Sequence, residues 1–290
     1  MKHLRAGLAA LVLMAAGVPQ GALAEGTDQE GGAEEDAKPE LDRLAWIQQE
    51  PEPDAAAQAA FEAWLAERDA ILSGQKEGTK DWHAWVREYQ VKAEAAETPF
   101  AREIYERVAL DQYGRYSGLF SLEHSAAMAA ALGHPLEGPS VAGFHDRVMK
   151  LLMRTDMANT AFLKAELEAR GGRWWAISEV GADVSGNIWL ITQHADMDRD
   201  FQRRALALME PLALSGEVDR QDFGYLMDRV AVAEKRPQRF GTQGRCVSPG
   251  DWEAFEIEAP AEEVNARRAA FDFKNTFEQN DDRLDALCAE

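Results

Sequence analysis

Three residues within a short segment have side chains suited to proton transfer: His194, Asp196 and Asp198. A histidine beside carboxylates at a helix end is stabilised as a cation, so His194 is a candidate general acid or base oriented by Asp196. Structural roles also account for these residues, because Asp198 is the expected N-cap of the next helix, Asp196 can order the turn and His194 borders a buried face. A turn rarely aims three side chains at one point, so no metal site is predicted.

Asp156 and Asn159 interrupt the apolar face of a long predicted helix. They share helical spacing with Val148, Leu152 and Leu163. A polar group on such a face is costly unless it finds a partner. The two side chains therefore either form a buried hydrogen bond between helices or face a ligand pocket, where Asp156 is a second candidate for orienting the histidine.

Further polar candidates lie in and after a later helix. Arg229 borders the core next to Val230 and is expected to pair with an aspartate of the site, to hold an anionic substrate group, or to lie on the surface. The following loop contains Gln238 and Gln243 on either side of Gly241. A tight turn at that glycine would expose backbone N–H groups and amides, as ligand-binding loops do.

The elements that must position these residues are predicted to be helices. Alanine, glutamate, leucine and arginine dominate, and no segment alternates with a period of two. The expected fold is all-α, an irregular multi-helix bundle with a loop-rich C-terminal tail. The expected helices are Asp54–Ser73, Asp81–Glu97, Pro99–Ser117, Leu119–Leu132, Ser140–Arg170, Glu179–Ala195, Asp198–Leu214, Asp219–Glu234 and Ala261–Phe271.

The first 24 residues are predicted to be a signal peptide. Lys2 and Arg5 precede an apolar run from Ala6 to Val18, and Ala22–Ala24 has the small residues at which signal peptidase cleaves. The run is shorter than the about 20 residues that a permanent membrane span needs. Cleavage after Ala24 would leave no stable membrane anchor and would place the protein in the periplasm or outside the cell.

The rest of the chain is expected to divide by composition. Residues 25–40 are acidic, almost without apolar side chains, and are predicted to be a disordered leader. An accessory helical segment is expected at 41–98, a helical core domain at 99–244 and a tail at 245–290. The two cysteines, Cys246 and Cys288, lie in this tail, and in an exported protein two cysteines favour a disulfide over a zinc site.

The formal net charge of −20 restricts the partners of the protein. It argues against nucleic acids and anionic lipid surfaces, which would be repelled. The sequence also lacks a glycine-rich phosphate loop, His-Glu-x-x-His and Gly-x-Ser-x-Gly, so the enzyme classes with those motifs are disfavoured. A small polar ligand is the remaining expected partner, and no cofactor is indicated.

Four ordered motifs resemble an uncharacterised bacterial domain family of unknown function, marked by Gln-His-Ala-Asp-x-Asp and Tyr-Gly-Thr-Gln. They are Trp175–Gly181, Gln193–Asp198, Tyr225–Val230 and Pro237–Gln243, and the segments Asp111–Arg115 and Asp156–Lys164 also fit. The resemblance covers roughly Ala101 to Gln243. Phe240 replaces the usual tyrosine, and Ala176 replaces a usual proline.

The resemblance supplies motif positions and no mechanism. The residues that it joins are Asp111, Gln112, Arg115, Asp156, Asn159, His194, Asp196, Arg229, Gln238 and Gln243. We expect Asp111, Gln112, Arg115, Asp156, His194 and Gln243 to converge on one polar pocket. Two functions fit such a pocket: an enzyme that uses His194 as a general acid or base on a small polar or anionic substrate, and a module that binds such a ligand, or a protein, without chemistry.

Overall fold

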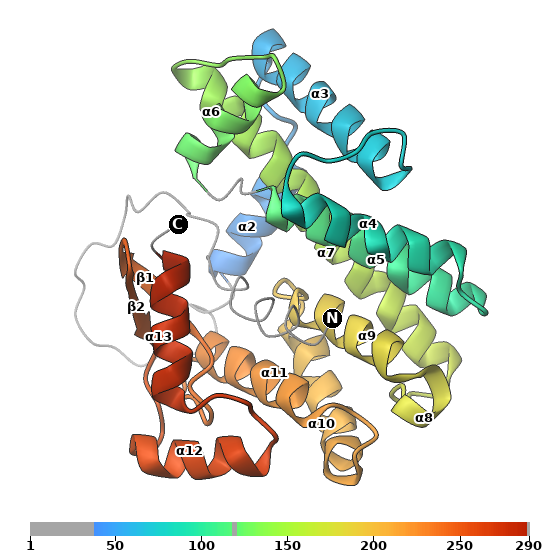
Figure 1. Ribbon diagram of the computed structural model, residues 1–290, viewed down its shortest axis with the longest axis vertical. Helices are drawn as coiled ribbons and strands as arrows, with labels where there is room; N and C mark the ends of the chain where they lie inside the picture. The colour runs from blue at the N-terminus through green and yellow to red at the C-terminus, as the bar shows by residue number, and fades with distance from the viewer. Residues whose placement is uncertain (1–37, 118–120, 289–290) are drawn as a thin grey trace. The chain divides into compact units, whose positions relative to one another are not determined.

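The computed structural model describes residues 38–117 and 121–288 (Figure 1). The chain divides into two compact units between Asn159 and Thr160, a boundary that falls inside helix α7. The described residues up to Asn159 are the N-terminal unit, and those from Thr160 on are the C-terminal unit. The signal peptide expected at 1–24 lies outside the described residues, and so does the leader expected at 25–40 up to Lys38, where α2 begins.

The N-terminal unit consists of helices in its described part. They are α2 (Lys38–Gln48), α3 (Ala55–Leu72), α4 (Asp81–Glu94), α5 (Pro99–Tyr116), α6 (Leu122–Ala131) and the part of α7 (Pro139–Ala169) that ends at Asn159. Local signals set several starts. The Thr98 side chain accepts a hydrogen bond from the Ala101 N–H and is followed by proline at the first helical position of α5, where no N–H is needed.

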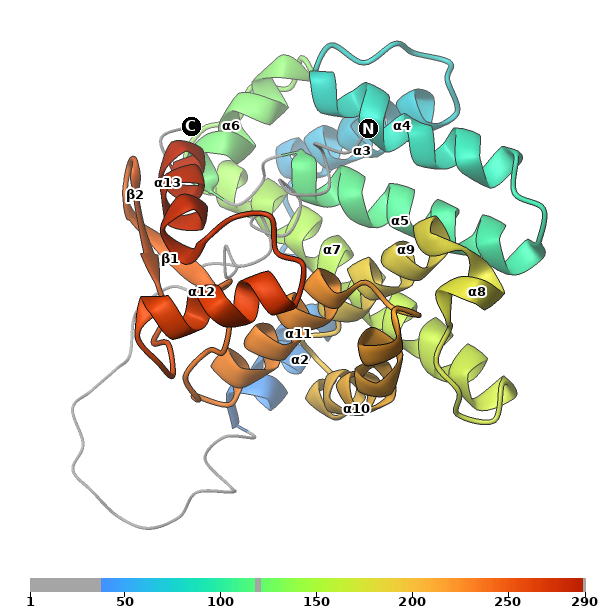
Figure 2. The same cartoon turned by 60° about the horizontal axis from the view of Figure 1, so that its bottom comes forward.

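Helices α4 and α5 lie side by side in both views (Figure 2). Val86 of α4 and Ile104 and Val108 of α5 are fully buried. The ring of Tyr113 on α5 contacts the ring of Trp64 on α3, with 5.6 Å between the ring centroids. This apolar packing holds α5 in place, and α5 carries half of the polar cluster described below.

The C-terminal unit starts with the end of α7 and continues through short helices. These are α8 (Ile177–Val180), α9 (Ala182–Gln193), α10 (Arg199–Ser215) and α11 (Arg220–Ala233). The single helix expected over Glu179–Ala195 is instead two helices, because Gly181 has a φ of 80° and ends α8. Only glycine adopts this conformation without strain, so a glycine there breaks the helical path.

The tail is more ordered than the expected loop-rich end. Strands β1 (Gly244–Ser248) and β2 (Asp251–Ala254) pair antiparallel, with Cys246 opposite Trp252. Helices α12 (Ala261–Ala270) and α13 (Phe277–Cys288) follow, and α13 lies beside the hairpin in both views (Figures 1 and 2). The expectation of an all-α chain is therefore corrected: the fold is mostly helical, with a small two-stranded sheet.

The tail is also covalently closed. The predicted disulfide between Cys246 and Cys288 is confirmed, and it joins β1 to the end of α13. The backbone N–H of Trp252 adds a 2.7 Å hydrogen bond to a carboxylate oxygen of Asp285. Among the described helices, none combines the length and the apolar content needed to cross a membrane.

Candidate functional site

One face of α5 and one face of α7 in the N-terminal unit carry polar side chains toward each other. On α5, Arg107, Asp111 and Arg115 are spaced by four residues, so they share a face of the helix. On α7, Asp156 and Asn159 are three residues apart. These five residues are the polar seam, and side-chain hydrogen bonds from Arg107 to Asn159 and from Arg115 to Asp156 join its halves.

Arg115 bridges the two carboxylates of the polar seam. Its Nη2 donates to Asp156 Oδ1 at 2.6 Å, and its Nε donates to Asp111 Oδ1 at 3.3 Å. Gln112 adds a donor, because its Nε2 lies 2.5 Å from Asp111 Oδ2. Asp111 is fully buried and Asp156 is 4% exposed. One guanidinium therefore holds two buried carboxyl groups close together.

Burial and the neighbouring Asp111 carboxylate both favour the protonated form of Asp156. Burial raises the pKa of Asp156 well above its usual value, and the Arg115 charge opposes this rise without cancelling it. The negative charge of Asp111 and a hydrogen bond to its side chain raise the pKa of Asp156 further. The raised pKa of Asp156 therefore favours a retained proton on this residue beside the Asp111 carboxylate. Carboxyl pairs of this kind can serve as acid and base together.

Asn159 extends the polar seam by an amide. Its Oδ1 accepts from Arg107 Nη1 at 3.2 Å. Its Nδ2 is buried and has no hydrogen-bond partner among the described residues. A buried donor without a partner costs free energy, so this position suits a ligand oxygen or a bound water.

His194 and Asp196 lie in the C-terminal unit, at the turn between α9 and α10. His194 is the C-cap residue of α9 and is 2% exposed. The Arg229 Nε donates to Asp196 Oδ1 at 2.8 Å, and its Nη2 donates to Asp196 Oδ2, which gives a two-pronged ion pair. Gln202 Nε2 donates to the same Oδ1 at 3.2 Å. Of the roles expected for Arg229, the structure shows pairing with an aspartate.

Asp196 is fixed as an anion in this arrangement. Burial alone would raise the pKa of Asp196, but the Arg229 guanidinium outweighs burial and the pKa lies below its usual value. An electrostatic interaction with the His194 side chain lowers the pKa of Asp196 further. Asp198 has the expected capping role: its Oδ1 accepts from the Phe201 N–H at 2.9 Å, and its Oδ2 pairs with Lys164 Nζ at 2.5 Å.

Gln238 and Gln243 serve to shape the loop that follows α11. Gln238 Nε2 donates to the carbonyl oxygens of Gln243 at 2.8 Å and Phe255 at 2.9 Å, and its Oε1 accepts from the Gln243 N–H at 2.6 Å. Gln243 Nε2 donates to Thr242 Oγ1 at 2.9 Å. The amide of Gln238 is thus used within the protein, while Gln243 Oε1 is buried without a hydrogen-bond partner among the described residues.

Asp228 organises the same loop and was not predicted from the sequence. Its carboxylate accepts from the backbone N–H groups of Arg239 at 2.8 Å, Phe240 at 3.1 Å and Thr242 at 2.9 Å. The Thr242 hydroxyl donates a fourth hydrogen bond at 2.9 Å. The one signal in the sequence was its place in the Tyr225–Val230 motif, beside the apolar face of α11. The turn itself needs Gly241, whose φ is 63° and where a Cβ would lie 2.5 Å from the Phe277 ring.

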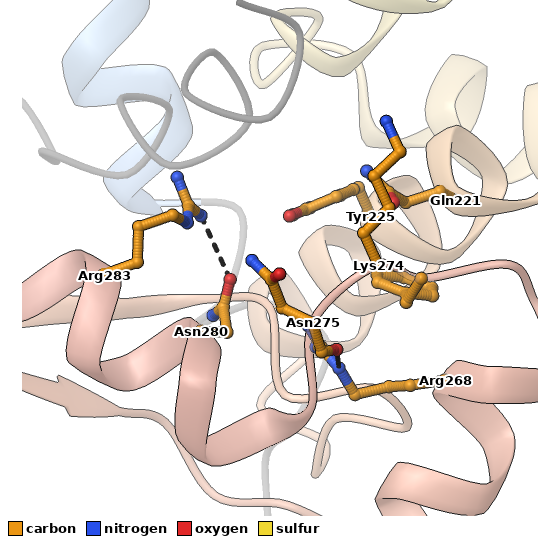
Figure 3. A pocket seen from close by; sticks show the side chains of 8 residues that line it. Gln221, Tyr225, Arg268, Lys274, Asn275, Asn280 and Arg283 are labelled. Atoms are coloured by element: carbon orange, nitrogen blue, oxygen red, sulfur yellow. Dashed lines mark hydrogen bonds between the residues drawn. The ribbon is translucent and has the colours of Figure 1, made fainter. Parts of the chain in front are cut away.

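The C-terminal unit also has a small cavity between α11, α12 and α13 (Figure 3). Its polar lining includes Tyr225, Arg268 and Asn280. Its volume of about 10 Å³ is room for about one water molecule. This cavity is therefore too small for an organic ligand and is not a candidate substrate site.

Within each unit, the structure brings several of the expected residues together. Asp111, Gln112, Arg115, Asp156 and Asn159 meet in the N-terminal unit. His194 and Asp196 meet Arg229, and Gln238 meets Gln243, in the C-terminal unit. The convergence of residues from both units on one pocket stays a prediction.

Comparison with known proteins finds a match to one family model. Residues 141–281 match the model of a family described as "Family of unknown function (DUF6624)". This range begins after Asp111 and Arg115 and extends beyond Gln243 into α13, so it lies further along the chain than the expected Ala101 to Gln243. Neither curated proteins nor solved structures gave a match. The expected resemblance to a family of unknown function is thus confirmed, over residues 141–281 of the chain.

Proposed function

We propose that the protein is an exported enzyme, built as an irregular bundle of helices, whose chemistry is proton transfer on a small polar or anionic substrate. The observation that supports this most strongly is the pair of buried carboxyl groups, Asp111 and Asp156, held together by Arg115. Purely structural polar contacts between helices do not need two acids at one place, because like charges disfavour each other. Acid–base catalysis does make use of such a pair.

The proposed roles follow from the contacts of the polar seam. Asp156 carries the proton and gives it to a substrate oxygen or nitrogen, while the Asp111 carboxylate accepts a proton from the substrate. Arg115 stabilises the negative charge that remains on the pair. The Asn159 Nδ2 group is available to donate to a substrate oxygen.

His194 is proposed as the acid–base residue of the C-terminal unit. It is buried, and the nearby Asp196 carboxylate is held by Arg229 and Gln202. A fixed anion beside an imidazole favours the protonated form, as a general acid requires. The second candidate function is ligand binding without chemistry, which is favoured by the Asn159 amide, since recognition of an oxygen needs no proton transfer.

Asp156→Asn is expected to abolish turnover without unfolding the protein. The amide can still donate toward Asp111 and accept from Arg115, so the free energy of unfolding should change by less than about 1 kcal/mol. Loss of the transferable proton should reduce the rate by about 10²- to 10⁴-fold. The measurement is depletion of compounds from a periplasmic small-molecule extract by mass spectrometry, comparing the wild type, Asp156→Asn and His194→Gln.

Asp200→Asn is the control, because the side chain of Asp200 is 87% exposed. If the wild type binds a compound and never consumes it, the enzyme proposal fails and the binding function stands. A large loss of stability in Asp156→Asn or His194→Gln would instead assign that residue a structural role.

The same Asp156→Asn variant also tests the raised pKa of Asp156, through the pH dependence of stability. The folded-state pKa of Asp156 is raised above the value of 3.8 for an unperturbed aspartate. Its stabilising contribution is therefore complete below about that pH and is lost as the pH rises through the folded-state pKa. Urea denaturation at a series of pH values above that of the unperturbed aspartate should show wild-type stability falling relative to the variant as the pH increases. Parallel pH profiles of the two proteins would contradict a raised pKa of Asp156.

We propose that the N-terminal residues are a signal peptide for export, which predicts cleavage after Ala24. The protein recovered from a periplasmic extract should begin at Glu25, because Ala22 and Ala24 are the small residues that signal peptidase recognises. Intact mass and N-terminal sequencing measure this directly. Recovery of the chain from the cytoplasm with Met1 retained would refute it, and Ala24→Arg is the variant expected to block cleavage.

A further inference from the structure

A cleft in the N-terminal unit lies apart from the residues of the polar seam. Its volume is about 400 Å³, which is within the usual range for small-molecule sites. It is lined by α3, by α7 and by the connection between α2 and α3, where Glu50 and Pro51 lie. None of the five seam residues lines it. The cleft is therefore a second place in this unit where a ligand can be held.

The cleft is basic although the protein is acidic. Four cationic side chains line it, Arg68, Arg147, Lys150 and Arg154, against the single carboxylate of Glu50. The whole chain has 51 acidic and 31 basic residues, so a concentration of cations in one cleft is contrary to its overall composition. Such a site attracts anions while most of the surface repels them.

Two of these cations have no carboxylate partner among the described residues. Lys150 pairs with Asp146 at 2.9 Å, and Arg68 pairs with Asp69 at 2.8 Å. The two arginines Arg147 and Arg154 form no ion pair of this kind. In the described part of the chain, the lining of the cleft thus keeps two positive charges without an ion pair within 4 Å, and Asp54 interacts with Arg147 only electrostatically over a longer distance.

Arg147 and Arg154 bind only neutral oxygens in the part of the chain that the structure describes. Arg147 donates to the carbonyl oxygens of Gly143 and Glu52, each at 2.8 Å, and to Gln58 Oε1 at 3.1 Å. Arg154 donates twice to the Ile47 carbonyl, at 2.9 and 3.1 Å. Arg147 is only 7% exposed. A buried guanidinium without a directly paired counter-ion is costly, and an anion in the cleft would supply that counter-ion.

The remaining walls of the cleft are apolar. Phe61 and Leu65 come from α3, and Leu151 comes from the same face of α7 as Arg147 and Arg154. These side chains are partly exposed in the cleft. A ligand that fits both features has an apolar body against the α3 side chains and an anionic group near the two arginines.

We propose that this cleft binds a water-dissolved organic anion that carries an apolar body and a carboxylate or phosphate group. The anionic group pairs with Arg147 and Arg154, and the apolar body lies against Phe61, Leu65 and Leu151. This site is separate from the proposed acid–base centre and does not depend on it. Binding here would also stabilise the connection after α2, because Arg154 already donates to the Ile47 carbonyl in the last turn of α2 and Arg147 donates to the Glu52 carbonyl within the connection.

Titration calorimetry with octanoate on the mature protein tests the proposal. Octanoate should bind more tightly than 1-octanol, which lacks the charge, and than inorganic phosphate, which lacks the apolar body. Arg154→Gln should weaken octanoate binding by about tenfold or more, since it removes a charge-assisted contact. Arg154 is chosen because its side chain is exposed and Arg147 keeps its own contacts with Glu52 and Gln58.

Two further variants make the result specific. Leu65→Glu should abolish binding by placing a negative charge in the apolar wall. Arg102→Gln, an exposed arginine on α5 outside the cleft, should leave the affinity unchanged. Equal octanoate affinity in the wild type and in Arg154→Gln would overturn the proposal, and so would the absence of any binding in the millimolar range.

Co-sedimentation with phosphatidylglycerol vesicles shows whether the cleft binds anionic lipid in a bilayer instead of a dissolved anion. We expect no co-sedimentation, because a net charge of −20 opposes binding to an anionic surface. Co-sedimentation that is lost in Arg154→Gln, together with no octanoate binding, would overturn the assignment of a dissolved ligand.

Discussion

Asp228→Ala is expected to lower the free energy of unfolding by about 3 to 5 kcal/mol, because it leaves several buried donors without an acceptor. The backbone N–H groups of Arg239, Phe240 and Thr242 and the Thr242 hydroxyl all donate to this carboxylate. Each buried donor left unpaired costs about 1 to 3 kcal/mol, and relaxation of the loop toward water would recover part of the sum.

The negative charge of Asp228 contributes to these hydrogen bonds. Burial raises its pKa to about 6, although the hydrogen bonds from the loop oppose the rise, so the side chain is an anion at pH 7. Asp228→Asn should therefore also destabilise the protein at pH 7, because the amide presents two hydrogens where the loop already presents donors. Its loss should be smaller than that of Asp228→Ala, since one acceptor oxygen remains.

Urea denaturation at pH 7 measures these effects. Asp200→Ala serves as the matched control and should change the stability by no more than about 0.5 kcal/mol, because that side chain is 87% exposed. A loss below about 1 kcal/mol in Asp228→Ala would contradict the view that this carboxylate holds the loop together.

Removal of the disulfide is expected to cost about 4 kcal/mol. Cys246 and Cys288 are separated by 42 residues, and a crosslink across a loop of that length restricts the unfolded chain by about this amount. The double variant Cys246→Ala/Cys288→Ala should therefore unfold at a lower urea concentration than the oxidised protein. Reduction of the wild type should give a similar shift.

The effect should be largest in the tail. Without the disulfide, the hydrogen bond from the Trp252 N–H of β2 to Asp285 of α13 still connects the hairpin to that helix. Thiol labelling followed by intact mass establishes the oxidation state, with the double variant as the control that takes up no label. Equal stability of the oxidised protein and the double variant would show that the disulfide closes a segment already fixed by other contacts.

Local signals in the sequence predicted most of the helices. The side chains of Thr98, Asp198 and Asp219 accept hydrogen bonds at the starts of α5, α10 and α11. Helix α7 follows the expected span from Ser140 to Arg170 closely. Caps and apolar spacing act within a few residues, so one sequence is enough to recognise them.

Elements that depend on distant partners were not predicted. The hairpin β1–β2 forms around Pro249 and Gly250, a turn signal that the sequence contained, and Asp285 and Cys288 of α13 hold it in place. Short strands with exposed side chains show little alternation of apolar and polar residues. Their pairing is therefore a property of the folded tail.

The candidate site likewise has features that local sequence predicts and features that depend on distant partners. Sequence alone placed Asp156 and Asn159 on the apolar face of one helix, because helical spacing is local, and the family resemblance added Asp111 and Arg115. Only the tertiary structure decided that Arg115 joins the two carboxylates and that Arg229 binds Asp196. Whether a buried acid is protonated depends on distances of a few ångströms between side chains of different helices, which the order of residues along the chain does not contain.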